Sequence, residues 1–181
     1  LKPQGTDGVR ANVYQDSEQK TEVNLDGSIH LNSRLSTATL LHFENRQMDH
    51  DGNNDGFMDM PKLRQYNIMH RWAYVSPLWI SQLMLRGLHD EREGGQSLKH
   101  LSHTLSEPPY STAIKTNRYE LQWKNGFTLN ADHNTSIALM LHGSWHDADH
   151  VFGLTQYDVT QKNGYAQLMF ETDVYTICTR S

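Results

Sequence analysis

Several features that define common protein classes are missing from this chain of 181 residues. Cys178 is its one cysteine, so no disulfide can form within the chain and no thiolate metal cluster is possible. No apolar run approaches the roughly 20 residues of a transmembrane helix, and the mean hydropathy is −0.70. There is no basic run, and the net charge of −5 argues against nucleic-acid binding. Membrane strands are not excluded, because a strand needs only every second residue to be apolar.

The two ends of the sequence carry a further expectation. Leu1, Lys2 and Pro3 do not form the charged region that precedes the apolar core of a signal peptide. We therefore expect either a chain that starts in the cytoplasm or a piece of a longer protein. The sequence stops at residues 177–181, inside an expected strand, and this favours a piece.

The segment 49–59 follows the calcium-loop pattern of an EF-hand. Asp51, Asn53, Asp55 and Asp59 occupy the first, third, fifth and ninth positions, and Gly56 supplies the sharp turn at the sixth. A hard cation requires several oxygens at once, and alternate residues of a tight loop point their oxygens inward. Carboxylates this close together repel each other unless a cation is present.

The match to the EF-hand is partial. Lys62 stands where an EF-hand places its bidentate glutamate, and the flanking segments lack a helical pattern. The alternative is a turn rich in Asn, Gly and Asp that binds no metal. We predict a calcium site, with water or a neighbouring loop completing the ligands, formed by Asp49, Asp51, Asn53, Asp55 and Asp59.

Most of the chain alternates between apolar and polar residues, which predicts β-strands. The alternating runs are about 10 to 14 residues long, whereas a globular strand has about 5 to 6 and a tilted membrane strand about 9 to 11. Length therefore favours a membrane barrel. The expected strands are Thr21–Leu31, Leu35–Arg46, Leu63–Val75, Trp79–Arg92, Arg118–Asn130, Thr135–His146 and Gly164–Ile177, with a shorter, weaker run at Val9–Tyr14.

The expected connections also alternate in length. Tight turns are predicted at 31–34, 76–78 and 131–134, and long loops at 47–61, 93–117 and 147–162. Short turns on one rim and long loops on the other are typical of outer-membrane barrels, whose long loops face outside the cell. Leu98, Leu101 and Leu105 have helical spacing, which indicates a short helix within the second long loop.

Aromatic residues mark both ends of the apolar runs. One tight turn is bracketed by Trp72, Tyr74 and Trp79. Near the long loops lie Tyr66, Tyr119 and Trp145. Two aromatic belts are expected where strands cross the two membrane interfaces. Any β-sheet is rich in Trp and Tyr, so the aromatic residues alone do not decide between architectures. Two alternatives therefore remain: a soluble eight-stranded barrel around a ligand and a complete small membrane barrel.

Eleven histidines raise the question of an enzyme or a zinc site. His142, His146 and His150 recur every four residues, but we expect the first two along one polar wall of a strand and the third in the loop beyond it. His100 and His103 are three apart. The sequence contains no GxSxG, HExxH, P-loop or dinucleotide motif, so we predict no catalytic activity.

Several of these segments resemble TonB-dependent outer-membrane receptors, in particular the Bacteroidetes type that is related to cobalamin receptors. The resemblance covers nearly the whole chain, and the calcium loop with its flanking strands is its most specific part. The segments that carry it are Asn24-Leu25-Asp26-Gly27, the loop 49–59, Met60-Pro61-Lys62-Leu63-Arg64-Gln65-Tyr66, His70-Arg71-Trp72, Arg92-Glu93-Gly94-Gly95-Gln96 and Tyr157-Asp158-Val159.

The resemblance implies a fold and a function. Such receptors have a plug domain inside a barrel of about 22 strands, so residues 1–8 would end the plug or its linker and residues 9–181 would form about eight barrel strands. It implies uptake of a scarce nutrient (cobalamin, a siderophore-like compound or a glycan), a calcium-ordered outer loop, and coupling to the TonB complex through the plug. It also implies location in the lipid of a Gram-negative outer membrane. The sequence departs from the family pattern at 178–181.

Overall fold

The computed structural model describes residues 7–97, 109–130 and 135–173. These residues form eight β-strands and no helix, which confirms the all-β prediction. The described residues contain no helix long and apolar enough to cross a membrane. The strands are β1 Gly8–Gln15, β2 Thr21–His30, β3 Leu35–Arg46, β4 Lys62–Val75, β5 Trp79–Gly95, β6 Ser111–Asn130, β7 Thr135–Phe152 and β8 Thr155–Glu171.

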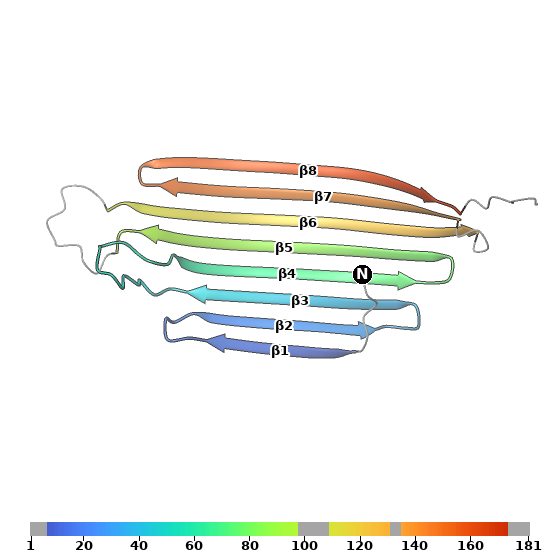
Figure 1. Ribbon diagram of the computed structural model, residues 1–181, viewed down its shortest axis with the longest axis horizontal. Coiled ribbons are helices and arrows are strands. Elements are labelled where there is room, and N and C mark those ends of the chain that lie inside the picture. The colour runs from blue at the N-terminus through green and yellow to red at the C-terminus, as the bar shows by residue number, and fades with distance from the viewer. Residues whose placement is uncertain (1–6, 98–108, 131–134, 174–181) are drawn as a thin grey trace, which may run out of the picture.

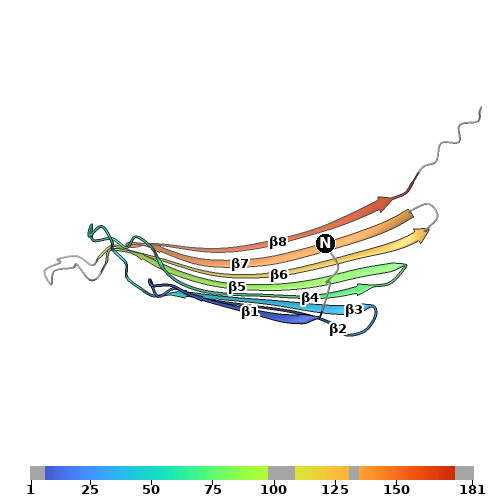
Figure 2. The ribbon, with the colours of Figure 1, turned by 60° about the horizontal axis from the view of Figure 1, so that its bottom comes forward.

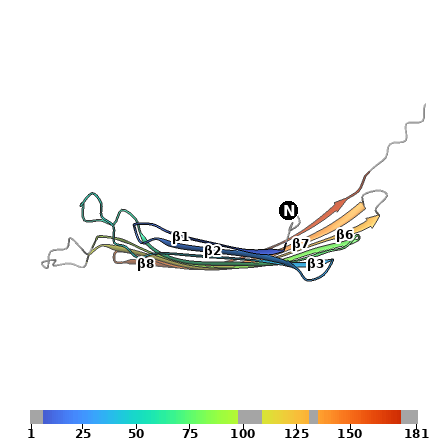
Figure 3. The same cartoon turned by 90° about the horizontal axis from the view of Figure 1, so that it is seen from below.

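The eight strands make one antiparallel sheet in which each strand pairs with the next along the chain. Figure 1 shows β1 and β8 at opposite edges of this sheet, and no pairing joins them within the described residues. The sheet is curved along its strands (Figures 2 and 3). It is therefore an open sheet, consistent with a fragment of a larger barrel.

The strands are a single layer with almost no core. Among the described residues, Leu63 and Ala148 are the only buried hydrophobic side chains. The register aligns apolar residues in rows across the sheet, such as Leu41, Ile68, Gly87, Tyr119 and Trp145. One face is thus mainly apolar, and we call it the apolar face; the opposite face, the polar face, carries His42, Asn67 and most of the charges.

Turn chemistry explains the short connections. The side-chain oxygen of Asn32 accepts hydrogen bonds from the backbone N–H groups of Arg34 and Leu35, both at 2.8 Å. Such bonds favour a reversal of the chain over continued strand pairing. The turn at 16–20, the loop at 47–61 and the turn at 153–154 lie at the other end of the strands, at the left of Figure 1.

Two predicted long loops are wrong in extent. Residues 147–162 belong largely to β7 and β8, which meet in a two-residue turn at Gly153 and Leu154; Phe152 pairs with Thr155, and Gly153 has a φ of +59°. Of the loop expected at 93–117, residues 93–95 belong to β5 and residues 111–117 to β6, while residues 98–108 lie outside the described part of the chain. Strand pairing continues here although the apolar face no longer carries apolar residues: Asp147 and Asp149 lie on it, while Ala148 and Val159 lie on the opposite face. The hydrophobic pattern of the strands is therefore lost while the pairing is not.

The final expected strand is shifted. β8 begins at Thr155 rather than Gly164 and ends at Glu171 rather than Ile177. The helix expected around Leu98, Leu101 and Leu105 lies outside the described residues. So do the turn 131–134, the end of the chain from 174 and residues 1–6 of the expected linker.

Candidate metal-binding loop and membrane-facing surface

The loop between β3 and β4 winds around the carboxylate of Asp51. Asp51 Oδ2 accepts a hydrogen bond from the backbone N–H of Gly56 at 3.0 Å, and its Oδ1 accepts one from Asp55 at 3.2 Å. Gly56 has a φ of +87°, a conformation that glycine adopts without steric cost. The sharp turn expected at the sixth position is therefore present.

Asn53 and Asp55 tighten the same turn. Asn53 Oδ1 accepts the backbone N–H of Asp55 at 3.1 Å, and Asp55 Oδ1 accepts that of Phe57 at 2.8 Å. The Asn53 amide also donates to Asp55 Oδ2 at 3.0 Å. These two polar side chains, with Asp51, thus lie on one short arc of the loop.

Asp59 closes the loop from its far end. Its Oδ2 accepts the backbone N–H of Gly52 at 2.7 Å, and its own N–H donates to the carbonyl of His50 at 2.8 Å. A side chain at Gly52 would meet the His50 ring at 3.1 Å and the Asp59 carboxylate at 3.2 Å. Asp49, the remaining predicted ligand, is half-buried at the start of the loop.

The loop is joined to the end of β5, a connection that the sequence did not predict. The N–H of Met58 donates to the carbonyl of Gly95 at 2.9 Å, and the N–H of Ser97 donates to the carbonyl of Gly56 at 2.8 Å. Phe57 and Gln96 form an isolated antiparallel bridge. The candidate metal loop and the base of the 96–110 loop therefore form one hydrogen-bonded unit.

The donors present fit a calcium ion in part. Within residues 7–97, 109–130 and 135–173, no three His, Cys, Asp or Glu side chains converge in a ready-made metal cluster. The arc nevertheless offers two carboxylates and an amide oxygen, the chemistry that calcium prefers. To bind calcium, Asn53 and Asp55 would have to exchange their mutual hydrogen bond for contacts with the ion.

The apolar face carries two groups of aromatic rings. Near the long loops, Tyr119 and Trp145 lie 5.7 Å apart between ring centroids. Near the tight turns, Trp79 lies 4.7 Å from Tyr74 and 5.9 Å from Phe127. Along β6, Tyr119 and Phe127 are separated by eight residues, or about 26 Å of strand. This is the scale of the roughly 25 Å apolar band of membrane barrels, and a tilted strand would span somewhat less of the bilayer.

Apolar side chains on this face are uncovered. Leu121, Trp123 and Phe127 expose 44%, 40% and 43% of their surfaces. All four tryptophans of the chain, Trp72, Trp79, Trp123 and Trp145, belong to the apolar face by strand register.

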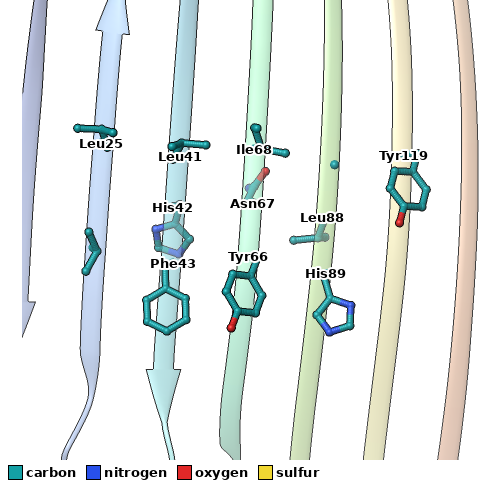
Figure 4. Close-up of a pocket in the computed structure, with 12 residues that line it drawn as sticks. Leu25, Leu41, His42, Phe43, Tyr66, Asn67, Ile68, Leu88, His89 and Tyr119 are labelled. Atoms are coloured by element: carbon teal, nitrogen blue, oxygen red, sulfur yellow. The ribbon is translucent and has the colours of Figure 1, made fainter.

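The apolar face is hollowed over Gly87, where the missing side chain leaves a groove of about 490 Å³. Figure 4 shows Leu25, Leu41 and Ile68 in a row across neighbouring strands, with Tyr119 on the next strand but one. Phe43, Tyr66 and His89 line the groove toward the long loops. Its walls are almost entirely hydrocarbon and aromatic.

Polar side chains on the apolar face pair with one another. The imidazole of His70 lies between the hydroxyls of Thr37 and Thr39. The indole N–H of Trp123 donates to Ser81 Oγ at 3.1 Å, and that of Trp79 donates to Asn125 Oδ1 at 3.3 Å. Polar groups that face hydrocarbon require such internal partners, because no water is present to replace them.

The polar face contains charged networks. Glu120, whose side chain is only 9% exposed, lies between Arg86 and Arg118. Asp90 accepts hydrogen bonds from Gln65 at 2.9 Å and from Arg92 at 2.8 Å. The cations that pair with Glu120 and Asp90 therefore cover these two carboxylates. The described residues form no second layer over the sheet that could do so.

The histidine series does not form a cluster. His150 lies within β7 rather than in the loop where we expected it, because β7 extends to Phe152. His142, His146 and His150 share the polar face but are four residues apart along the strand, about 13 Å each. The His142 ring stacks on Tyr165 at 5.0 Å between centroids. His100 and His103 lie outside the described residues.

Comparison with models of protein families, with curated proteins and with solved structures gives no match for this chain.

Proposed function

We propose that this chain is a part of an outer-membrane β-barrel whose apolar face contacts lipid and whose polar face lines a water-filled interior. The observation that carries the proposal is the uncovered apolar face of a single-layer sheet. A soluble protein of this size would bury such side chains in a core, since each fully buried large side chain contributes about 1.5–3 kcal/mol. Lipid provides the same stabilisation from outside.

Three further observations support this orientation. The aromatic rings lie in two bands, as expected at two membrane interfaces. The groove over Gly87 offers apolar walls to an acyl chain. Polar groups on that face have partners within the sheet. An eight-stranded soluble or membrane barrel is less well supported, because β1 and β8 do not pair in the part of the chain that is described.

Within that class, we propose that the full protein is a TonB-dependent receptor for nutrient uptake, which is the family that the sequence resembles. The full receptor would take up cobalamin, a siderophore-like compound or a glycan. The outward loops would bind the ligand, and the plug domain would connect the barrel to the TonB complex. This chain's contribution is structural: it supplies barrel wall and the loops at 47–61 and 96–110. The proposal includes no catalytic step.

We propose that the loop at 49–59 holds calcium. Asp51, Asn53 and Asp55 would be the principal ligands, while Asp49 and Asp59 lie at the two ends of the loop. Calcium would neutralise the carboxylates. Because Met58 and Gly56 are bonded to Gly95 and Ser97, it would also hold the base of the 96–110 loop in place. An ordered loop loses less conformational entropy when a ligand binds.

Fluorescence quenching by brominated lipid tests the orientation. The full chain is refolded into bilayers whose acyl chains carry bromine, in variants that keep only Trp123 or Trp145 and have Phe at the other tryptophan positions. We expect strong quenching of both, because both rings are exposed on the apolar face. The control has Phe at all four positions and a Gln122→Trp substitution on the polar face, next to Trp123 on β6.

The comparison between the two faces decides the outcome. Quenching of Trp123 and Trp145 together with a weakly quenched Gln122→Trp variant supports the barrel. Equal quenching of both faces, or a chain that stays monomeric and folded in buffer without detergent or lipid, contradicts it.

A further inference from the structure

The polar face carries a concentration of positive charge at its centre, although the chain as a whole has a net charge of −5. Arg71 on β4, Arg86 on β5, and Arg118 and Lys124 on β6 share this face by register. Glu120 is the one carboxylate among them. We call Arg71, Arg86, Arg118 and Lys124 the basic patch.

The basic patch is not neutralised within the sheet. Arg86 and Arg118 share the single carboxylate of Glu120. The guanidinium of Arg71 and the ammonium of Lys124 form no ion pair with any described residue, and Arg71 Nε is buried without a hydrogen-bond partner among those residues. Elsewhere on the same face Arg10 pairs with Asp26 and Arg92 with Asp90, and Lys20, in the turn before β2, pairs with Glu22 and Glu44. Arg46 instead donates to the carbonyl oxygen of Pro61 at 3.2 Å.

A hollow of about 450 Å³ lies beside Arg71 on the polar face. Leu40 and Met69 line it with apolar surface, and Ser28 and Arg71 add hydrogen-bond donors. Arg10 and Asp26 also line it and form an ion pair at 2.8 Å, so Arg71 is the cation of the hollow that has no carboxylate partner among the described residues. Its size falls within the range of small-molecule sites, about 300–1,000 Å³. The patch itself spans three strands, or about 10 Å across the sheet, and about 20 Å along β6.

We infer that the basic patch and this hollow bind a small solute that carries several carboxylates. The charge of the patch requires an anion, and the guanidinium groups of Arg71 and Arg86 have the planar fork that matches a carboxylate. The compact hollow fits a small molecule better than an extended polypeptide. The inference rests on the proposed function, because there the polar face lines a passage for solutes, and it narrows the transported ligand to an anionic one.

Calorimetric titration with citrate, a compact tricarboxylate, tests the inference. The full chain is refolded in zwitterionic micelles at low ionic strength. We expect citrate to bind, Arg71→Gln and Lys124→Gln each to weaken binding at least fivefold, and a tenfold rise in salt to weaken it further. Lys115→Gln is the matched control, because Lys115 lies on the same strand but on the apolar face, 3.5 Å from Glu91.

Each other outcome has a defined meaning. Absence of citrate binding overturns the inference, as does an equal loss in Lys115→Gln. Binding of a hexaglutamate peptide without binding of citrate overturns it too, and assigns the patch to an acidic polypeptide. Lipid quenching of Trp123 measured on the same samples separates the two proposals: if quenching persists while citrate does not bind, the barrel proposal stands and this inference alone fails.

Discussion

The hydroxyl of Thr39 lies 2.6 Å from Nδ1 of His70, on a face of the sheet that is otherwise apolar. The hydroxyl of Thr37 lies 3.0 Å from the other ring nitrogen of His70, Nε2. His70 interrupts the apolar alternation of β4, and its neighbours on β3 explain why the interruption is tolerated. An imidazole with both nitrogens satisfied can face hydrocarbon at a far smaller cost than a bare one.

Removal of these hydroxyls is expected to destabilise the sheet. Thr39→Val keeps the shape of the side chain but leaves His70 Nδ1 without its partner, which costs about 1–3 kcal/mol. His70→Leu in the Thr39→Val background should recover much of this loss, because no unsatisfied ring remains. Urea unfolding in micelles, followed by tryptophan fluorescence, measures both. A Thr39→Val variant as stable as the parent would contradict the account.

Much of the fold follows from period-two alternation. β3 matches its predicted bounds of Leu35–Arg46, and β2 differs by a single residue at its end. The signal is strong there because one face is apolar and the other polar. Beyond the aromatic band near the long loops this pattern is lost, because the apolar face there carries Lys115 paired with Asp149, while Ala148 and Val159 lie on the opposite face. The alternation of the main apolar runs therefore does not predict the extensions of β5, β6, β7 and β8.

The candidate sites differ in how far they could be predicted. The position of Gly56 and the inward oxygens of Asp51 and Asp55 follow from the local pattern, since the loop's own residues supply these contacts. The bonds from Met58 to Gly95 and from Ser97 to Gly56 depend on strand pairing far along the chain. The basic patch likewise requires the register of β4, β5 and β6, which a single sequence does not specify.

Gly95 is expected to be intolerant of substitution. It has a φ of +118°, and an added Cβ would lie 2.4 Å from the backbone oxygen of Tyr110. We expect Gly95→Ala to cost about 2–3 kcal/mol locally and to expose the amides of Met58 and Gln96 to faster hydrogen exchange. Gly126→Ala is the control, because its Cβ would meet no atom within 4 Å. Equal exchange rates in the two variants would contradict the prediction.

Glu120→Gln is expected to affect stability and anion binding in opposite directions. The substitution leaves Arg86 and Arg118 without their shared carboxylate, and breaking a mostly buried ion pair costs up to about 3–5 kcal/mol. The same change makes the basic patch more positive, so citrate should bind more tightly. Urea unfolding and calorimetry on one preparation measure the two effects. Weaker citrate binding by a variant that still folds would argue against the patch.

Lys20 is expected to give the turn between β1 and β2 a stability that is lost at high pH. Its ammonium lies 3.1 Å from Glu44 and 3.2 Å from Glu22, and these hydrogen bonds, that to Glu44 first, raise the pKa of Lys20 above the ordinary 10.5. A raised pKa means that the contribution is complete below the unfolded value and disappears as the pH rises through the folded value.

The pH dependence can be measured by comparing the chain with its Lys20→Met variant. We expect a loss below about 1 kcal/mol from pH 6 to pH 9, because the pair is partly exposed. The difference should shrink once the pH exceeds 10.5. A difference that stays constant up to pH 12, beyond the ordinary lysine range, would show that packing of the methylene groups, and not charge, is responsible.

Calcium binding should depend on Asp51 more than on any other residue of the loop. Asp51 supplies the first-position carboxylate and also accepts the N–H groups of Asp55 and Gly56. We expect Asp51→Asn and Asp55→Ala each to weaken calcium binding at least tenfold in calorimetric titrations, and magnesium to compete poorly because it demands a stricter geometry. Glu18→Gln changes a half-buried carboxylate of the 16–20 turn on the same rim; it serves as the control and should bind as the parent does.

A second measurement separates metal binding from damage to the loop. Hydrogen exchange of the Ser97 amide, which bonds to the carbonyl of Gly56, should slow when calcium is added to the parent chain and should not respond in Asp51→Asn. If heats and exchange rates are the same in the parent and in Asp51→Asn, the loop is a turn held by its own hydrogen bonds. The carboxylates would then serve only as acceptors for the backbone, as they already do at Asp59 and Gly52.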